Sequence, residues 1–317
     1  MEYEVSFIKF IRVSFSIFIV FGLISSSILN AKEVQVAGTK IAIEPPSEFT
    51  ASAQFPGFQH KNSGSSIMIT EIPGPIENVS RGMTKEGLAS RGMTLIEKNK
   101  IVVNKQNANL LKISQHHGGV EYLKWMILFG DSSSSVLIVG TFPASADIKI
   151  GKKIKKSILT FVWNKEATVD FFDGLSFKIG ESSELKYAKR MANMVILGRE
   201  GEFGKAGVTN PVLIAGSSIS QTSIDNLKAF SKQRLLDTKN LEEIVVIEER
   251  SFKVDGNDAY EIIADAKDST DKIPVVIYQV IIPKESNYFI VQGMVGKLIS
   301  KSYLEQFSQL ASNITIE

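Results

Sequence analysis

The sequence predicts an α+β fold made of two copies of an antiparallel β-sheet flanked by helices. The 317 residues suffice for two domains of roughly 150 residues each. Along the chain, segments that alternate between apolar and polar residues, as strands do, occur together with segments that have the spacing of amphipathic helices. The same order of segments occurs twice, which predicts an α/β/α sandwich in each half.

The repeat is clearest in two 18-residue stretches. Residues 96–113 read IEKNKIVVNKQNANLLKI, and residues 247–264, which begin 151 positions later, read IEERSFKVDGNDAYEIIA. The matching positions are Ile96, Glu97, Val103 and Ala108 in the first stretch and Ile247, Glu248, Val254 and Ala259 in the second. Solenoid repeats have periods of only about 20–50 residues, so this offset predicts duplication of a whole domain, with copies at 32–164 and 170–317.

The first copy is expected to contain six strands and two helices. Prolines 45 and 46 end the first strand, and a Pro-Gly-Pro sequence at 73–75 ends the second. The apolar residues Met83 and Leu88 favour a helix, and the spacing of Ile150, Ile154 and Ile158 favours a closing helix. The expected strands are 40–43, 65–70, 95–103, 109–115, 122–130 and 135–141, and the first helix is 79–91.

The second copy repeats this order after a short link at 163–170. Its helices are expected at 223–236 and around Leu304, Phe307, Leu310, Ala311 and Ile314. The Asp-Gly pair at 255–256 predicts a tight hairpin turn. The expected strands are 174–179, 185–189, 194–199, 211–217, 243–248, 251–254, 259–266, 275–282 and 288–294.

Residues 1–31 have the pattern of a secretory signal peptide. Lys9 and Arg12 precede an uncharged apolar run at 13–24, and small residues lead to Ala31, the expected last residue of the signal. An uncleaved anchor is the alternative, although the apolar run is short for a membrane span. The chain has no cysteine, which excludes disulfides and Cys-bound zinc. We therefore expect export to the periplasm or the extracellular side of a bacterial envelope.

The charge differs between the two halves. Residues 32–164 contain 16 Lys and Arg against 10 Asp and Glu, a net charge of +6, whereas residues 165–317 contain 18 against 22, a net charge of −4. Neither half is basic enough to predict nucleic-acid binding. The two copies are therefore expected to differ in what they contact.

Several motifs of both copies resemble the PsbP-like/DcrB-like proteins, which include the LpqN type. The features are the opening GTKIAIEPP at 38–46 and the Asp-Gly-Asn hairpin at 255–257. A Gly-containing strand follows in each copy, IVGTF at 138–142 and FIVQGM at 289–294, and each copy ends on SILTF at 157–161 or SNITI at 312–316. Lys105 departs from the pattern at the position of Gly256, and the second copy lacks the proline pair. The resemblance implies an exported envelope protein with a non-enzymatic binding or assembly role and no shared catalytic residues.

Two groups of residues are candidate sites. His116, His117 and Glu121 offer imidazole and carboxylate ligands for Zn²⁺ or Mn²⁺, provided that both histidines lie in a turn, and a polar hairpin tip is the alternative. A run of lysines on the closing helix of the first copy could contact anionic lipid headgroups or be a solvated helix face. These lysines are Lys149, Lys152, Lys153, Lys155 and Lys156.

The sequence therefore predicts a non-catalytic, exported binding or assembly protein that engages an envelope protein or a small ligand, without a cofactor and without nucleic acid. The expected binding site is a groove between sheet and helix or between the two copies. A peripheral membrane-surface module that uses the lysine helix is the alternative. A metal-binding protein or hydrolase at His116 and His117 is a further one.

Overall fold

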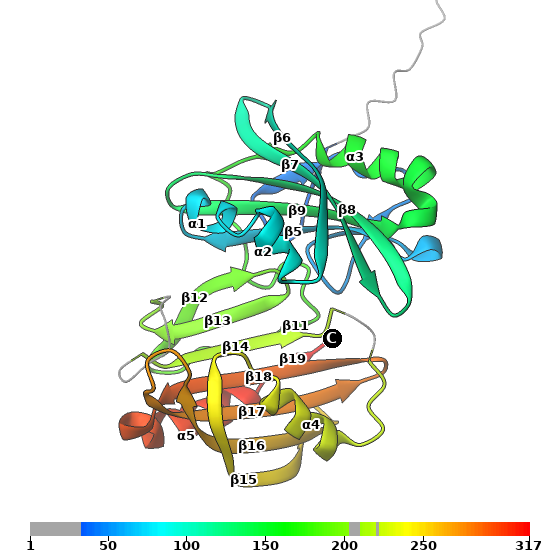
Figure 1. Cartoon of the computed structure of the whole chain (residues 1–317). Coiled ribbons are helices and arrows are strands. Elements are labelled where there is room, and N and C mark those ends of the chain that lie inside the picture. The colour runs from blue at the N-terminus through cyan, green and yellow to red at the C-terminus, as the bar shows by residue number, and fades with distance from the viewer. Residues whose placement is uncertain (1–32, 203–209, 220–221) are drawn as a thin grey trace, which may run out of the picture. The chain divides into compact units, whose positions relative to one another are not determined.

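The computed structural model describes residues 33–202, 210–219 and 222–317. The predicted signal peptide lies outside the described residues. Residues Lys32–Glu317 form one compact unit that contains two seven-stranded antiparallel sheets (Figure 1). No helix among the described residues is long and apolar enough to cross a membrane.

The first large sheet has the strand order β3-β4-β5-β9-β8-β7-β6. Its strands are β3 (Thr50–Ala51), β4 (Gly57–His60), β5 (Ser65–Pro73), β6 (Met93–Val103), β7 (Gln106–His117), β8 (Val120–Gly130) and β9 (Ser134–Pro143). The second has the order β12-β13-β14-β18-β17-β16-β15. Its strands are β12 (Leu185–Met191), β13 (Met194–Arg199), β14 (Val212–Ser217), β15 (Leu241–Val254), β16 (Asn257–Asp268), β17 (Pro274–Lys284) and β18 (Asn287–Gly296). When the strands are matched in chain order, the two sheets have the same topology.

The hydrogen-bond register repeats as well. In the β6–β7 hairpin Ile101 pairs with Ala108, and in the β15–β16 hairpin Phe252 pairs with Ala259, each residue 151 positions after its counterpart. The register shifts between Leu95 and Glu97 in β6 and between Val246 and Glu248 in β15, again 151 positions apart. The repeated Ile-Glu pair of the sequence therefore marks a β-bulge on the outermost strand of each sheet.

Two smaller sheets accompany the large ones. Strand β2 (Ile41–Ile43) pairs with β1 (Val34–Gln35) and β10 (Val162–Trp163), and β11 (Phe177–Lys178) pairs with β19 (Thr315–Ile316). In each copy the opening strand is thus joined to the strand that closes the copy. Such pairing brings the start and the end of each copy together.

Each large sheet is buried on both faces because its central strands alternate between two cores. In β8, Trp125 belongs to the core on one face and Met126 to the core on the other. In β17, Tyr278 and Ile277 divide in the same way. This pattern is that of a sheet covered by helices on both sides.

The helices cover these faces. In the first copy α1 (Ile76–Ser80) and α2 (Lys85–Ala89) pack on one face and α3 (Lys152–Ile158) on the other. In the second copy α4 (Leu227–Leu236) and α5 (Ser300–Ser312) lie on opposite faces, α4 in front and α5 behind in Figure 1. The predicted α+β class, with two antiparallel sheets flanked by helices, is confirmed.

The closing helix lies close to its sheet because each copy has a glycine beneath it. A Cβ added to Gly140 would lie 2.0 Å from Ile154 Cγ2, and a Cβ added to Gly293 would lie 2.5 Å from Phe307 Cδ2. Both the glycines and the helix residues are 153 positions apart. The offset thus grows from 151 to 153 beyond the repeated hairpin.

Four predicted elements, two helices and two strands, differ from the structure. The predicted helix 79–91 is two helices, because the chain turns at 81–84 and the Thr84 side chain caps a new helix by accepting from Gly87 N. The predicted helix 223–236 begins only at Leu227, where Asn226 caps it. The predicted strands 243–248 and 251–254 form the single strand β15, because the bulge is accommodated without ending the strand.

Candidate functional site

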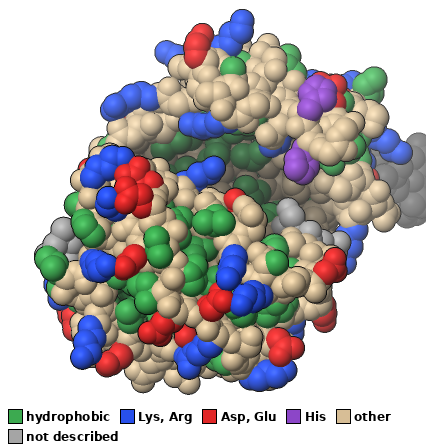
Figure 2. Space-filling model, turned by 60° about the horizontal axis from the view of Figure 1, so that its bottom comes forward, with side chains coloured by type: hydrophobic (Ala, Val, Ile, Leu, Met, Phe, Trp, Pro, Cys, Tyr) green, Lys and Arg blue, Asp and Glu red, His purple; other side chains and the backbone are tan. Residues whose placement is uncertain are grey.

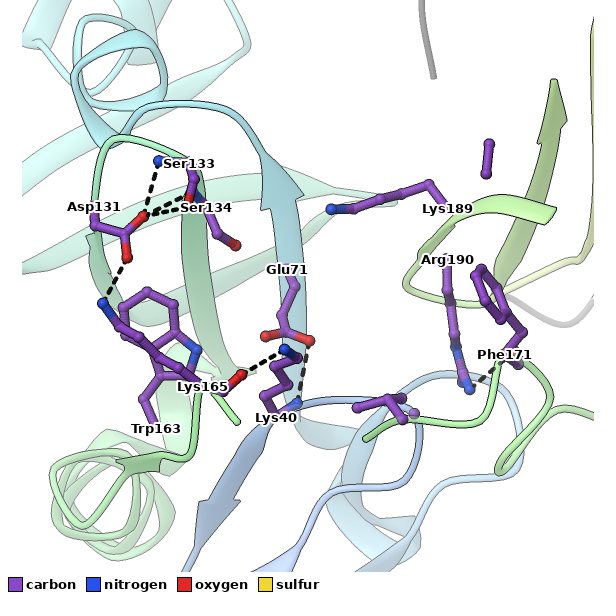
Figure 3. Close-up of a pocket in the computed structure, with 13 residues that line it drawn as sticks. Lys40, Glu71, Asp131, Ser133, Ser134, Trp163, Lys165, Phe171, Lys189 and Arg190 are labelled. Carbon is purple, nitrogen blue, oxygen red and sulfur yellow. Dashed lines mark hydrogen bonds and ion pairs between the residues drawn. The ribbon is translucent and has the colours of Figure 1, made fainter. Parts of the chain in front are cut away.

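The compact unit contains a pocket of about 410 Å³ around the link between the two copies (Figure 3). Its size is within the range of small-molecule sites. Its walls come from both large sheets and from the link. The lining residues are Gly38, Lys40, Glu71, Asp131, Ser133, Ser134, Trp163, Lys165, Val169, Phe171, Ala188, Lys189 and Arg190.

One wall is a chain of paired groups around Lys165. Lys165 Nζ lies 2.5 Å from Asp131 Oδ2 and 4.2 Å from the centroid of the Trp163 ring. Lys40 Nζ donates to the Lys165 carbonyl oxygen at 2.5 Å. The hydrogen bond from Lys165, with those from Ser133 and Ser134, holds the pKa of Asp131 well below its usual range. Asp131 is therefore an anion that is already neutralised by Lys165.

Glu71 is the second acidic group of the pocket. Its Oε2 accepts from the Lys40 backbone N at 3.1 Å. Burial raises the pKa of Glu71, and the bond from Lys40 and the charges of Lys40 and Lys189 oppose that rise only in part. Trp163 Nε1 is buried and has no hydrogen-bond partner of good geometry among the described residues. It nevertheless lies close enough to Glu71 to help lower the pKa of that carboxyl group.

Arg190 is held in place by carbonyl oxygens. Its Nε donates to Ala192 O at 3.1 Å, and its Nη1 donates to Phe171 O and Asp173 O. Burial lowers the pKa of Arg190 to about 10, so the group still carries its charge at neutral pH. Its Nη2 is buried and makes no hydrogen bond with any described residue. The guanidinium therefore retains an unused donor.

Gly38 allows this position of Arg190. A Cβ on Gly38 would lie 1.9 Å from Arg190 Nη1, so a larger residue could not occupy the site without displacing the guanidinium. Gly38 has a φ of +69°, which favours glycine, and its backbone N donates to Asp173 Oδ2 at 3.0 Å. The opening turn of the first copy is therefore joined to the second copy at this point.

Lys189 and Arg190 line the same pocket although they are neighbours in a strand. The register of β12 against β13 shifts between Tyr187 and Lys189, which leaves Ala188 as a bulge residue. Bulges redirect side chains and often occur beside sites. In Figure 3 Lys189 extends toward the side of the pocket where Glu71 lies, and Arg190 points toward Phe171. Among the described residues Lys189 has no hydrogen-bond or ion-pair partner.

The arrangement favours an anion. Four lining residues are cationic and two are acidic, and the Asp131 charge is neutralised by Lys165. Among the described residues neither Lys189 Nζ nor Arg190 Nη2 has an acceptor, but Nη2 is shielded from solvent and the charges of Asp170 and Asp173 act on the guanidinium. Lys189, which is half-buried, is therefore the unpartnered cation that an anionic ligand could contact.

The predicted metal ligands lie elsewhere, at the tip of the β7–β8 hairpin. Strand β7 continues through His117, and the turn is made by Gly118 and Gly119, so the histidines are strand residues. His116 pairs with Glu121 and His117 with Val120, which directs the two imidazoles to opposite faces. The described residues contain no group of three His, Cys, Asp or Glu side chains that could hold a metal ion. A metal site at His116, His117 and Glu121 stays a prediction.

The predicted lysines lie in and just before α3, and two of them have local partners. Lys153 pairs with Glu48, and Lys155 Nζ lies 4.0 Å from the centroid of the Trp125 ring. The other three, Lys149, Lys152 and Lys156, are exposed. Figure 2 shows Lys and Arg interspersed with Asp and Glu on the face it presents, rather than a field of one sign.

Sequence reasoning did not identify the residues of the pocket. The sequence predicts 163–170 only as a connection between the two copies. Trp163 and Lys165 at its start are the residue types that could have indicated a binding site there. Nothing in the neighbourhood of Lys189 and Arg190 distinguishes them from other basic strand residues. Their role depends on a bulge and on a glycine about 150 residues away along the chain.

No protein-family model matches the chain, and no curated protein matches it. Solved structures do match. LpqN, involved in cell envelope biogenesis of Mycobacterium tuberculosis, covers 44% of this chain and 82% of its own at 10% identity, with a TM-score of 0.33. Cyanobacterial PsbP from Synechocystis sp. PCC 6803 covers 45% of this chain and 93% of its own at 10% identity, with a TM-score of 0.26.

The immunity protein TplEi of the T6SS from Pseudomonas aeruginosa covers 90% of this chain and 97% of its own at 10% identity, with a TM-score of 0.32. At such similarity none of these structures supplies functional residues. LpqN and PsbP carry the names of the PsbP-like and LpqN-type proteins that the sequence motifs resemble.

Proposed function

We propose that this chain is a non-catalytic, exported binding protein of the cell envelope that holds a small ligand or part of a protein partner in the pocket at the link. The two copies, residues 32–164 and 170–317, provide the walls. The observation that supports this function is a pocket of about 410 Å³ whose lining includes Lys189, a cation that has no hydrogen-bond or ion-pair partner among the described residues. Export is supported by the signal pattern of residues 1–31.

Arg190 fixes one wall of the pocket. Three carbonyl oxygens accept from its Nε and Nη1, and its Nη2 is shielded from solvent, so this wall is formed before any ligand arrives. Binding in a preformed pocket costs little conformational entropy. The chain also has no cysteine nucleophile, and none of its three histidines lines the pocket.

Two neighbouring serines provide a matched test. Ser133 lines the pocket and Ser132, which is exposed, does not. The chain is isolated from its native envelope as wild type, Ser133→Trp and Ser132→Trp, and native mass spectrometry records any bound molecule or partner chain. We expect a bound species on the wild type and on Ser132→Trp, and its loss from Ser133→Trp.

Other outcomes remove the proposal. A bound species that is equally present on all three proteins would place the binding outside the pocket. Recovery of the wild type without any bound species, at physiological ionic strength, would count against a binding function. Circular dichroism of both tryptophan variants checks that each is folded.

A membrane-surface function is the second candidate, and one observation favours it. Ile148, just before α3, is 79% exposed and lies beside the exposed Lys149. An exposed aliphatic side chain beside lysines is the composition of a peripheral contact with anionic lipid. The vesicle experiment in the Discussion separates this function from the pocket.

A further inference from the structure

We propose that the first copy holds a second binding site, the pocket that Asn109 lines, and that this pocket takes a phenol ring. The Asn109 pocket has a volume of about 520 Å³, which is within the range of small-molecule sites. It shares no lining residue with the pocket at the link. The proposal is therefore independent of the function proposed above.

Asn109 of β7 is the counterpart of Tyr260 of β16. Asn109 pairs with Leu128 of β8, and Tyr260, 151 positions later, pairs with Ile281 of β17. Leu128 and Ile281 are both buried, with 1% and 0% of their surface exposed. The two copies thus have the same apolar floor at this point, and they differ in the side chain beside it.

In the second copy the Tyr260 ring fills this place. Tyr260 is only 5% exposed and belongs to the core beneath α4, the helix that lies against β16 and β17 across the front of the sheet (Figure 1). In the first copy α1 lies mainly against β8 and β9, and α2 against β6. The part of β7 at Asn109 stays open between them, and asparagine is too short to fill the space that a ring occupies in the other copy.

The polar groups of the two places also correspond. The Tyr260 hydroxyl lies near a carboxylate and an ammonium group, since it helps lower the pKa of Glu249 and raise the pKa of Lys228. The charged residues that line the Asn109 pocket are likewise one acid, Glu77, and one base, Lys100.

This pair of charges selects a neutral ligand that carries a hydroxyl. A phenol hydroxyl can donate to a carboxylate and accept from an ammonium group at the same time. The ring itself supplies a large apolar surface for the floor at Leu128. An anion would gain from Lys100 and lose to Glu77, so the lining gives it no net advantage.

The experiment titrates residues 32–317 with four probes, followed by calorimetry and by ligand-observed NMR. The probes are p-cresol, which is the side chain of tyrosine alone, toluene, 4-methylbenzoate and N-acetyl-tyrosinamide. We expect p-cresol to bind, toluene to bind about fivefold more weakly because it makes no hydrogen bond, and 4-methylbenzoate to bind no more tightly than p-cresol. Tighter binding of N-acetyl-tyrosinamide than of p-cresol identifies a tyrosine side chain of a polypeptide as the source, and the opposite order identifies a free phenol.

The variants assign the binding to the Asn109 pocket. Asn109→Tyr places the side chain of the second copy in the pocket and should weaken p-cresol binding at least tenfold. Thr94→Tyr is the matched control, because Thr94 is exposed on β6 and does not line the pocket, and its affinity should equal that of the wild type. Circular dichroism of both variants checks that each is folded. Lys100→Ala, at an exposed position, should weaken p-cresol binding and leave toluene binding unchanged.

Four results would overturn the proposal. The first two are no binding of p-cresol to the wild type and equal binding of toluene and p-cresol. The third is undiminished binding of p-cresol to a folded Asn109→Tyr. The fourth is tighter binding of 4-methylbenzoate than of p-cresol, which would make the pocket an anion site instead.

Discussion

Arg250 and Glu261 face each other across β15 and β16, with Arg250 Nε 2.6 Å from Glu261 Oε1 and Arg250 Nη2 3.2 Å from Glu261 Oε2. Glu261 is only 6% exposed and also accepts from Tyr278 Oη at 2.6 Å. Burial and this bond to Glu261 raise the pKa of Tyr278. The first sheet has no such group, because Asn99 faces the buried Leu110 there. The same scaffold thus carries a charged cluster in one copy and an uncharged pair, Asn99 and Leu110, in the other.

The ion pair predicts that removing Arg250 and removing Glu261 with its donor Tyr278 will lower the free energy of unfolding by different amounts. Arg250→Asn leaves Glu261 buried with fewer partners and should lower the free energy of unfolding by about 1.5–3 kcal/mol. The double variant Glu261→Leu with Tyr278→Phe removes the buried charge and its donor, and leaves Arg250 with a half-exposed side chain that water can solvate. It should cost less. Urea unfolding measures both, and a greater cost for the double variant would contradict this account.

The glycine beneath α5 predicts a packing effect. Gly293→Ala places a methyl group against the Phe307 ring and should destabilise the chain by about 1–3 kcal/mol, because the buried ring has little room to move. Gly180→Ala, where a Cβ meets no atom within 4 Å, is the control and should change stability by less than about 0.5 kcal/mol. Equal stability of the two variants would show that the helix is not held at this distance.

The raised pKa of Glu71 predicts a pH-dependent gain for Glu71→Gln. Burial raises the pKa of the folded state above the ordinary 4.5, so the folded protein holds this proton more tightly than the unfolded chain. The protonated Glu71 therefore contributes fully to the stability of the fold below about pH 4.5, and this contribution is lost as pH rises through the folded pKa. Relative to wild type, Glu71→Gln should gain stability between pH 4 and pH 7. Urea unfolding at pH 4 and pH 7 tests this, with Glu166→Gln, at an exposed position, as the control. A stability gain of Glu71→Gln that became smaller as pH rises would contradict this account.

The lysines in and just before α3 predict weak or no binding to anionic vesicles. Lys153 and Lys155 are engaged with Glu48 and Trp125, and each remaining lysine contributes only about 1 kcal/mol near an anionic surface. We expect no co-sedimentation with anionic vesicles at about 0.15 M salt. Binding that is abolished by glutamate at Lys149, Lys152 and Lys156, and retained by a triple variant at Lys61, Lys85 and Lys105, would favour the membrane-surface function instead.

The duplicated sheets predict that each half folds alone. Residues 32–164 and 170–317 each contain a complete seven-stranded sheet with a core on both faces. Expressed separately, both should show a cooperative thermal transition by circular dichroism. Each should be less stable than in the full chain, because the contact of Gly38 with Arg190 and Asp173 is lost. A half that melts without cooperativity would contradict the assignment of two domains.

Local patterns determined most of the fold. The alternation of residues predicted the central strands of both sheets, and the Asp-Gly pair at 255–256 predicted the β15–β16 turn, where Asp255 and Gly256 have φ values of +48° and +77°. Asn104 and Lys105 form the same turn in the first copy, with φ values of +47° and +65°. Sequence comparison of the two hairpins anticipated this equivalence, because turn chemistry and strand period depend on neighbouring residues.

The sequence by itself predicted the order of the elements and the α+β class, since both depend on short-range pattern, and it indicated that this order occurs twice. The tertiary structure alone decided where the pocket lies. Gly38, Asp131, Trp163 and Arg190 meet there from four separate parts of the chain. Their meeting depends on a bulge at Ala188, on the close approach that Gly38 permits and on the packing of the link. Such long-range contacts follow from how whole sheets and their cores close, which no local period records.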